Sequence, residues 1–199
     1  MVSKCAVLAA ACLALNAQTP KPVIDNDRVT VWDVQWAKDT LDPSRGRALD
    51  TVILWTAGPK VRTALFIPKG KVHDEHAPDG SRSLIIELKD HSQAQAPYPN
   101  PTQYPLAFPR PHVKKLLENK RMVVWSYRWN PGEPTPMHFH DKDVVVVYLE
   151  DTALTSTTPD GKKTRNQYKA FDVKFNKGNR THTELLDHGT GSAMMMELK

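Results

Sequence analysis

Residues 119–149 read NKRMVVWSYRWNPGEPTPMHFHDKDVVVVYL. Two parts of this stretch predict β-strands: residues 122–129 are β-branched and aromatic with partial alternation, and residues 144–149 are a continuous apolar run, typical of a strand buried on both faces. Between them stand His138 and His140. Because successive strand side chains alternate between faces, both imidazoles project from one face, as a metal site requires.

The first part of this stretch repeats an earlier one. NDRVTVWDVQW at residues 26–36 matches NKRMVVWSYRW at 119–129 with an offset of 93, and both tryptophan pairs keep that register. Later, IIELK at 85–89 matches MMELK at 195–199 with an offset of 110, so the second copy carries an insertion of 17 residues. The repeat predicts two related β-units in one chain.

The composition is that of a soluble globular protein. The 199 residues are 40% hydrophobic and 25% charged, which excludes a polytopic membrane protein and a wholly disordered chain. Sixteen prolines against nine glycines disfavour a mostly helical fold, and only residues 113–119 have a helical pattern. Six of the prolines lie between residues 96 and 111, where we expect an extended linker strapped across the surface.

The N-terminus has the pattern of a signal peptide. Lys4 precedes an apolar run, and a small residue, Ala17, precedes a polar segment, so residues 1–17 predict a secreted or periplasmic protein. Lipoprotein anchoring at Cys12 is the alternative. Both cysteines, Cys5 and Cys12, lie in this segment, so the mature chain is expected to have neither a disulfide nor a reactive thiol.

The charges argue against a nucleic-acid partner. The formal net charge is +5, and the basic residues are scattered rather than focused on one face. We therefore expect no nucleic-acid partner, and no membrane partner in the mature form.

A third histidine stands far along the chain. His182 follows Gly178 after a turn, and its distance in sequence from His140 suits ligands on different strands of one barrel. Glu184, two residues further on, shares the face of His182 if the strand is regular, and is a candidate general base.

These motifs resemble those of the cupin superfamily. Gly132-x5-His138-x-His140 is similar to the first cupin motif, and Gly178 followed by His182 is similar to the second. Pro68-x-Gly70-x-x-His73 in the first copy also fits the second motif.

Residues 23–199 thus resemble a bicupin. The resemblance implies an all-β fold of duplicated double-stranded β-helix (jelly-roll) barrels: a degenerate N-terminal barrel at 18–91, a proline-rich linker at 92–112 and a C-terminal barrel with the metal motif at 113–199. It also implies one divalent metal ion per chain (Zn, Mn, Fe, Ni or Cu), held by His138, His140 and His182.

Several positions depart from the cupin pattern. Valine occupies positions 144 and 145, where the first motif has its glutamate, and Asp143 is a candidate fourth ligand only if the chain bends after His140. In the first copy, Arg45 and Arg47 occupy the positions of the histidine pair, so that unit is expected to be metal-free. Whether His73 and His76 form any site stays open.

Two functions from different classes follow. The first is a metal-dependent enzyme acting on a small organic substrate, with the reaction open among dioxygenase, isomerase, decarboxylase and lyase. The alternative is a noncatalytic bicupin that binds a small ligand or has a structural role. Two barrels in one chain are compatible with a monomer or a homodimer.

Overall fold

The computed structural model describes residues 21–38, 40, 42, 49–71, 77–90 and 97–199. These residues form strands and no helix, which confirms the predicted all-β class. The strands are β1 (Ile24–Asp25), β2 (Val29–Gln35), β3 (Asp50–Ala57), β4 (Thr63–Ile67), β5 (Arg82–Leu88), β6 (Val113–Glu118), β7 (Met122–Arg128), β8 (His138–His140), β9 (Val144–Tyr148), β10 (Thr152–Thr157), β11 (Lys163–Tyr168), β12 (Val173–Asn176), β13 (Arg180–Gly189) and β14 (Ser192–Leu198).

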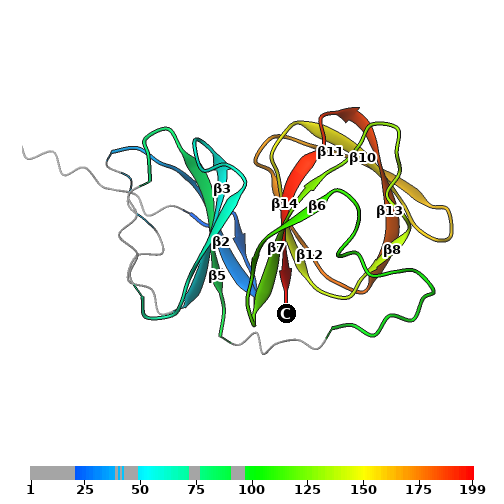
Figure 1. Cartoon of the computed structure of the whole chain (residues 1–199), viewed down its shortest axis with the longest axis horizontal. Coiled ribbons are helices and arrows are strands. Elements are labelled where there is room, and N and C mark those ends of the chain that lie inside the picture. Colours follow the sequence, from blue (N-terminus) through cyan, green and yellow to red (C-terminus); the bar gives the residue numbers. More distant parts are fainter. Residues whose placement is uncertain (1–20, 39, 41, 43–48, 72–76, 91–96) are drawn as a thin grey trace, which may run out of the picture.

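The second copy is a jelly-roll barrel made of two sheets. One sheet has the order β12-β9-β14-β7-β6 and the other β11-β10-β13-β8, and the paired strands are antiparallel. In Figure 1 these strands enclose the right-hand half of the molecule. An apolar cluster that includes Trp125, Trp129 and Met195 fills part of the barrel, as expected for aromatic residues repeated at strand spacing.

The first copy contributes a sheet with the same strand order. Its order is β1-β2-β5-β3-β4, in which β2, β5, β3 and β4 correspond to β7, β14, β9 and β12. The inserted 17 residues correspond to the β10–β11 hairpin, which spans Thr152–Tyr168. The counterparts of β8 and β13 fall largely on residues outside the described ranges, so a closed N-terminal barrel stays a prediction.

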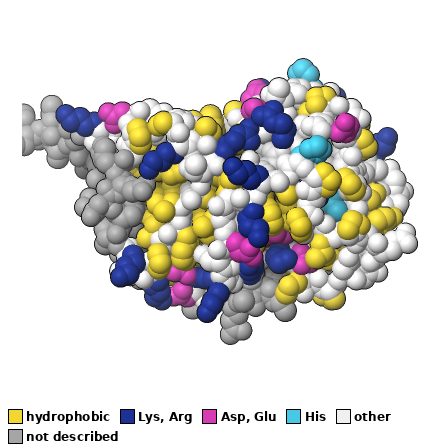
Figure 2. Space-filling model, in the orientation of Figure 1, with side chains coloured by type: hydrophobic (Ala, Val, Ile, Leu, Met, Phe, Trp, Pro, Cys, Tyr) yellow, Lys and Arg dark blue, Asp and Glu magenta, His cyan; other side chains and the backbone are white. Residues whose placement is uncertain are grey.

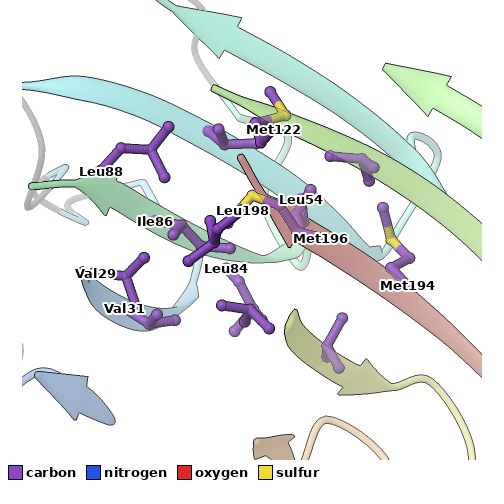
Figure 3. Close-up of a cluster of buried hydrophobic side chains, with 14 residues drawn as sticks. Val29, Val31, Leu54, Leu84, Ile86, Leu88, Met122, Met194, Met196 and Leu198 are labelled. Carbon is purple, nitrogen blue, oxygen red and sulfur yellow. The ribbon is translucent and has the colours of Figure 1, made fainter. Parts of the chain in front are cut away.

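The two copies pack sheet against sheet. Residues of β2, β3 and β5 form one apolar cluster with residues of β7, β9 and β14, and Figure 3 shows Ile86 and Leu84 close to Met196 and Leu198. All of β9 and β14 is therefore buried, because this middle sheet is covered on both faces. Met194 and Met196 face the first copy, whereas Met195 faces the barrel interior.

The helix predicted at residues 113–119 is wrong. Residues Val113–Glu118 form strand β6, which pairs with β7 at the edge of the middle sheet. The register shifts between Lys115 and Leu117, and this bulge interrupts the alternation that would have identified a strand.

The proline-rich segment is a strap along the barrel. Within residues 97–112, Leu106 bridges Phe139, the Ala107 amide donates to the Phe139 carbonyl, and the Phe139 amide donates to the Pro105 carbonyl, at 2.8 Å each. These bonds cover the edge of β8 that β13 leaves open. Tyr98 is held similarly, because its amide donates to the Asp141 carbonyl.

Some predictions fall outside the described residues: the signal peptide at 1–17, and the side chains of Arg45, Arg47, His73 and His76. Within the described part of the chain, no helix is long and apolar enough to span a membrane. On the face seen in Figure 2, basic and acidic side chains are interspersed.

Candidate metal centre

Strands β8 and β13 bring the three predicted histidines together. His182 lies directly opposite His138 in the antiparallel register, and His140 follows two residues along β8, so all three imidazoles project into the barrel. One nitrogen from each ring lies within 4.8 Å of the others. The side chains are buried, with 2%, 6% and 8% exposure for His138, His140 and His182.

The unsatisfied nitrogens of this cluster fit a divalent metal. His138 Nδ1 donates to the Pro136 carbonyl at 2.7 Å, so its Nε2 carries the lone pair that a metal would use, and His182 Nε2 is buried without a hydrogen-bond partner. The Nε2 atoms of His138 and His140 are 3.2 Å apart. Two nitrogens bound to one metal at about 2.1 Å lie about 3.0–3.4 Å apart, so this spacing suits shared coordination.

Burial keeps these imidazoles in the form that binds metals. Desolvation is the largest cause that lowers the pKa of His138, to about 3, and Arg110 and His182 lower it further. Burial likewise lowers the pKa of His140 and of His182. The rings are therefore neutral at pH 7.

Arg110 of the strap reaches the histidines. Its Nη1 lies 2.8 Å from His138 Nε2, and its Nη2 lies 3.7 Å from Glu184 Oε2. The guanidinium also lies over the ring of Tyr127, 4.2 Å from its centroid. Stacking and pairing hold this buried cation beside the proposed metal ligands.

Glu184 lies where the strand alternation predicted. Its Oε1 is 3.8 Å from His182 Nε2, and its Oε2 accepts a hydrogen bond from Trp129 Nε1 at 3.1 Å. Burial tends to raise the pKa of this carboxyl, but His182 and Arg110 outweigh it and hold the pKa below its usual range. The carboxylate is therefore ionised at neutral pH and can accept a proton.

The structure does not bring Asp143 into the cluster. Its Oδ1 accepts a hydrogen bond from the Gly178 amide at 2.8 Å, and its Oδ2 lies 3.8 Å from Arg28 Nη1 in the first copy. The chain does not bend after His140 as a fourth ligand would need. Asp143 instead fixes the turn before β13 and ties the two copies together.

A cavity of about 220 Å³ opens beside His140 and His182. Its lining combines apolar side chains with amides, hydroxyls and two guanidinium groups. It is lined by Arg110, His140, Val144, Val146, Tyr148, Leu154, Ser156, Asn166, Tyr168, Asn176, Arg180, His182, Glu184 and Met195.

Sequence reasoning missed two of the charged residues in this cavity. Arg180 stands two residues before His182, and the alternation that placed Glu184 also puts Arg180 on the same face, so the signal was present. Arg110 carries no such signal, because it lies in a proline-rich segment without periodicity and only the path of the strap brings it inward.

Comparisons with known proteins found matches among solved structures. No family model matches the chain, and no curated protein matches it in sequence. Among solved structures, a cupin domain from Bordetella pertussis is 24% identical, covering 49% of this chain and 98% of that one, with a TM-score of 0.41. A cupin 2 conserved barrel domain protein from Leptotrichia buccalis is 12% identical, covering 90% and 88%, with a TM-score of 0.49.

A polyketide cyclase from Streptomyces resistomycificus is 18% identical, covering 49% of this chain and 70% of that one, with a TM-score of 0.36. Because all three TM-scores lie below 0.5, these likenesses say nothing about the substrate or reaction of this chain.

Proposed function

We propose that this protein is an exported, metal-dependent cupin enzyme that acts on a small organic molecule. The observation that carries the proposal is the convergence of three buried, neutral imidazoles, those of His138, His140 and His182, of which the last two line a cavity. The composition of residues 1–17 supports export.

The residues of the cavity define what the chain would contribute to a reaction. A divalent metal in such a site supplies Lewis-acid chemistry or activates water or dioxygen. Glu184, ionised and beside His182, would accept a proton from the bound substrate. Arg110 lies 3.7 Å from Glu184 and would stabilise its charge, and Val144 and Leu154 would contact apolar parts of the substrate.

The alternative is a noncatalytic bicupin in which any metal is structural. In that case we would expect side chains such as Met137 and Phe139 to fill the space beside the histidines. Neither lines the cavity, and Phe139 pairs with the strap on the outer side of β8. The open space next to His140 and His182 favours the enzyme.

Elemental analysis of the purified full-length protein tests the metal centre. We expect about one equivalent of a transition metal per chain, and loss of that metal in His138→Ala and His140→Ala, because two remaining imidazoles bind weakly. His188→Ala, which removes an exposed histidine at the end of β13, is the matched control and should keep the metal. A His138→Ala/His140→Ala protein with stoichiometric metal would refute the assignment.

A further inference from the structure

The charges around the cavity do not balance. Arg110 is compensated, because Glu184 lies 3.7 Å away and Tyr127 and Phe108 stack against the guanidinium. Arg180 also lines the cavity, but it forms no ion pair with any residue that the structure describes. A half-buried guanidinium without an ion pair can therefore take an anion that enters the cavity as its direct partner.

Arg180 is held so that its terminal nitrogens remain available. It is the first residue of β13 and lies directly opposite His140 in the register with β8. Its Nε donates to the Lys177 carbonyl at 2.7 Å, which orients the guanidinium plane. Its Nη1 and Nη2 make no hydrogen bond to the described residues, and a guanidinium edge of this kind matches the two oxygens of a carboxylate.

Neighbouring polar side chains also have free hydrogen-bonding capacity within the described part of the chain. Ser156, Asn166 and Asn176 line the same cavity, and none of their side chains makes a hydrogen bond within the described part of the chain. Amides and hydroxyls of this kind supply further donors to an oxygen-rich group.

The apolar residues of the cavity indicate what else the ligand carries. Val144, Val146, Leu154 and Met195 present an apolar surface, which an inorganic anion would leave uncovered. The volume of about 220 Å³ lies below the range of about 300–1,000 Å³ that is typical of drug-sized ligands.

We propose that the cavity binds a small organic carboxylate, with its oxygens on Arg180 and its carbon skeleton against Val144, Val146 and Leu154. This rests on the proposed function, because it takes the space beside His140 and His182 to be the substrate cavity. Arg180 is then the residue that selects anions over neutral molecules of the same shape.

Titration calorimetry with matched probes tests this. Butyrate and benzoate are compared with butyramide and benzamide, which have the same shape without the charge, and with inorganic phosphate. We expect the carboxylates to bind wild-type protein at least about 10-fold more tightly than the amides, since a hydrogen bond to a charged group contributes about 1.5–3 kcal/mol. Phosphate should bind more weakly than benzoate.

Variants of Arg180 test whether this residue causes the preference for carboxylates. Arg180→Met should lose about 10-fold or more in benzoate affinity while keeping its metal content, and Arg180→Lys should keep part of the preference for carboxylates. Arg165→Met, which removes an exposed arginine from β11, is the matched control and should bind as wild type does. Equal benzoate affinity in Arg180→Met and wild type would overturn the inference, as would equal binding of amides and carboxylates or preferential binding of phosphate.

Metal content measured on the same samples separates the two proposals. Carboxylate selectivity in protein that never binds metal would refute the metal enzyme and support the anion site. Bound metal without carboxylate selectivity would refute the anion site and leave the metal centre supported.

Discussion

At the scale of single residues, the three histidines proposed to bind a metal have a positively charged neighbour, Arg110. Arg110 donates to the same nitrogen, His138 Nε2, that a metal would use. A cation at that distance repels a divalent ion by several kcal/mol at an effective dielectric constant of about 20. Glu184 offsets part of this repulsion, because its carboxylate lies between Arg110 and His182.

Removing the Arg110 charge should therefore strengthen metal binding. We expect Arg110→Met to bind zinc at least about 10-fold more tightly than wild type in a competition titration with a chromophoric chelator, because the guanidinium no longer opposes the ion. Arg128→Met, an exposed arginine at the end of β7, is the control. Unchanged or weaker zinc binding in Arg110→Met would show that the guanidinium does not face the metal position.

A second residue-scale prediction concerns the buried Glu197. Burial is the main cause that raises its pKa, although Trp125 Nε1 donates to its carboxylate at 2.8 Å. A carboxyl with a raised folded-state pKa stabilises the fold most below the unfolded value, near 4.5, and this contribution is lost as the pH rises through the folded pKa. Glu197→Gln should thus gain stability relative to wild type between pH 4 and pH 7.

Urea denaturation across that pH range measures the difference. Glu133→Gln, at an exposed position, serves as control for the loss of one carboxylate. A stability difference between Glu197→Gln and wild type that does not change with pH would contradict the raised pKa.

At the scale of elements, the strap and the turn before β13 depend on each other. A Cβ at Gly178 would lie 2.6 Å from the ring of Tyr98 and 2.9 Å from the backbone of Lys142. We expect Gly178→Ala to lower the free energy of unfolding by about 1–3 kcal/mol, because neither neighbour can move freely. In a Tyr98→Ala background the cost should be smaller, and a double-mutant cycle by urea denaturation measures that coupling. Additive effects would mean that the strap does not press on this turn.

The elements also show what the sequence can and cannot predict. The repeat and the alternation in residues 138–140 and 182–184 identified the strand pattern and the histidine cluster, because these signals are local. Arg110 was missed, since its place depends on the path of a segment whose bonds run to β8. Strand β6 was mistaken for a helix because a bulge breaks its alternation, and only pairing with β7 identifies it.

At the scale of the whole molecule, the two copies share one core. Leu84 of the first copy is fully buried in the cluster that joins β5 to β14 and β9. Leu84→Ala should lower the free energy of unfolding by about 2–5 kcal/mol, and tryptophan fluorescence and metal release should report a single transition. Val61→Ala, at an exposed apolar position, is the control. Metal release that stays at the wild-type denaturant concentration would show that the copies unfold independently.

The main difference in length between the two copies, the hairpin of β10 and β11, forms part of the cavity. It coincides with the 17 residues that the second copy has in addition to the first, and it supplies Leu154, Ser156, Asn166 and Tyr168 to the cavity. The histidines belong to other strands, β8 and β13. Substitutions confined to the cavity-facing residues of this hairpin are therefore expected to alter ligand preference while the three proposed metal ligands stay in place.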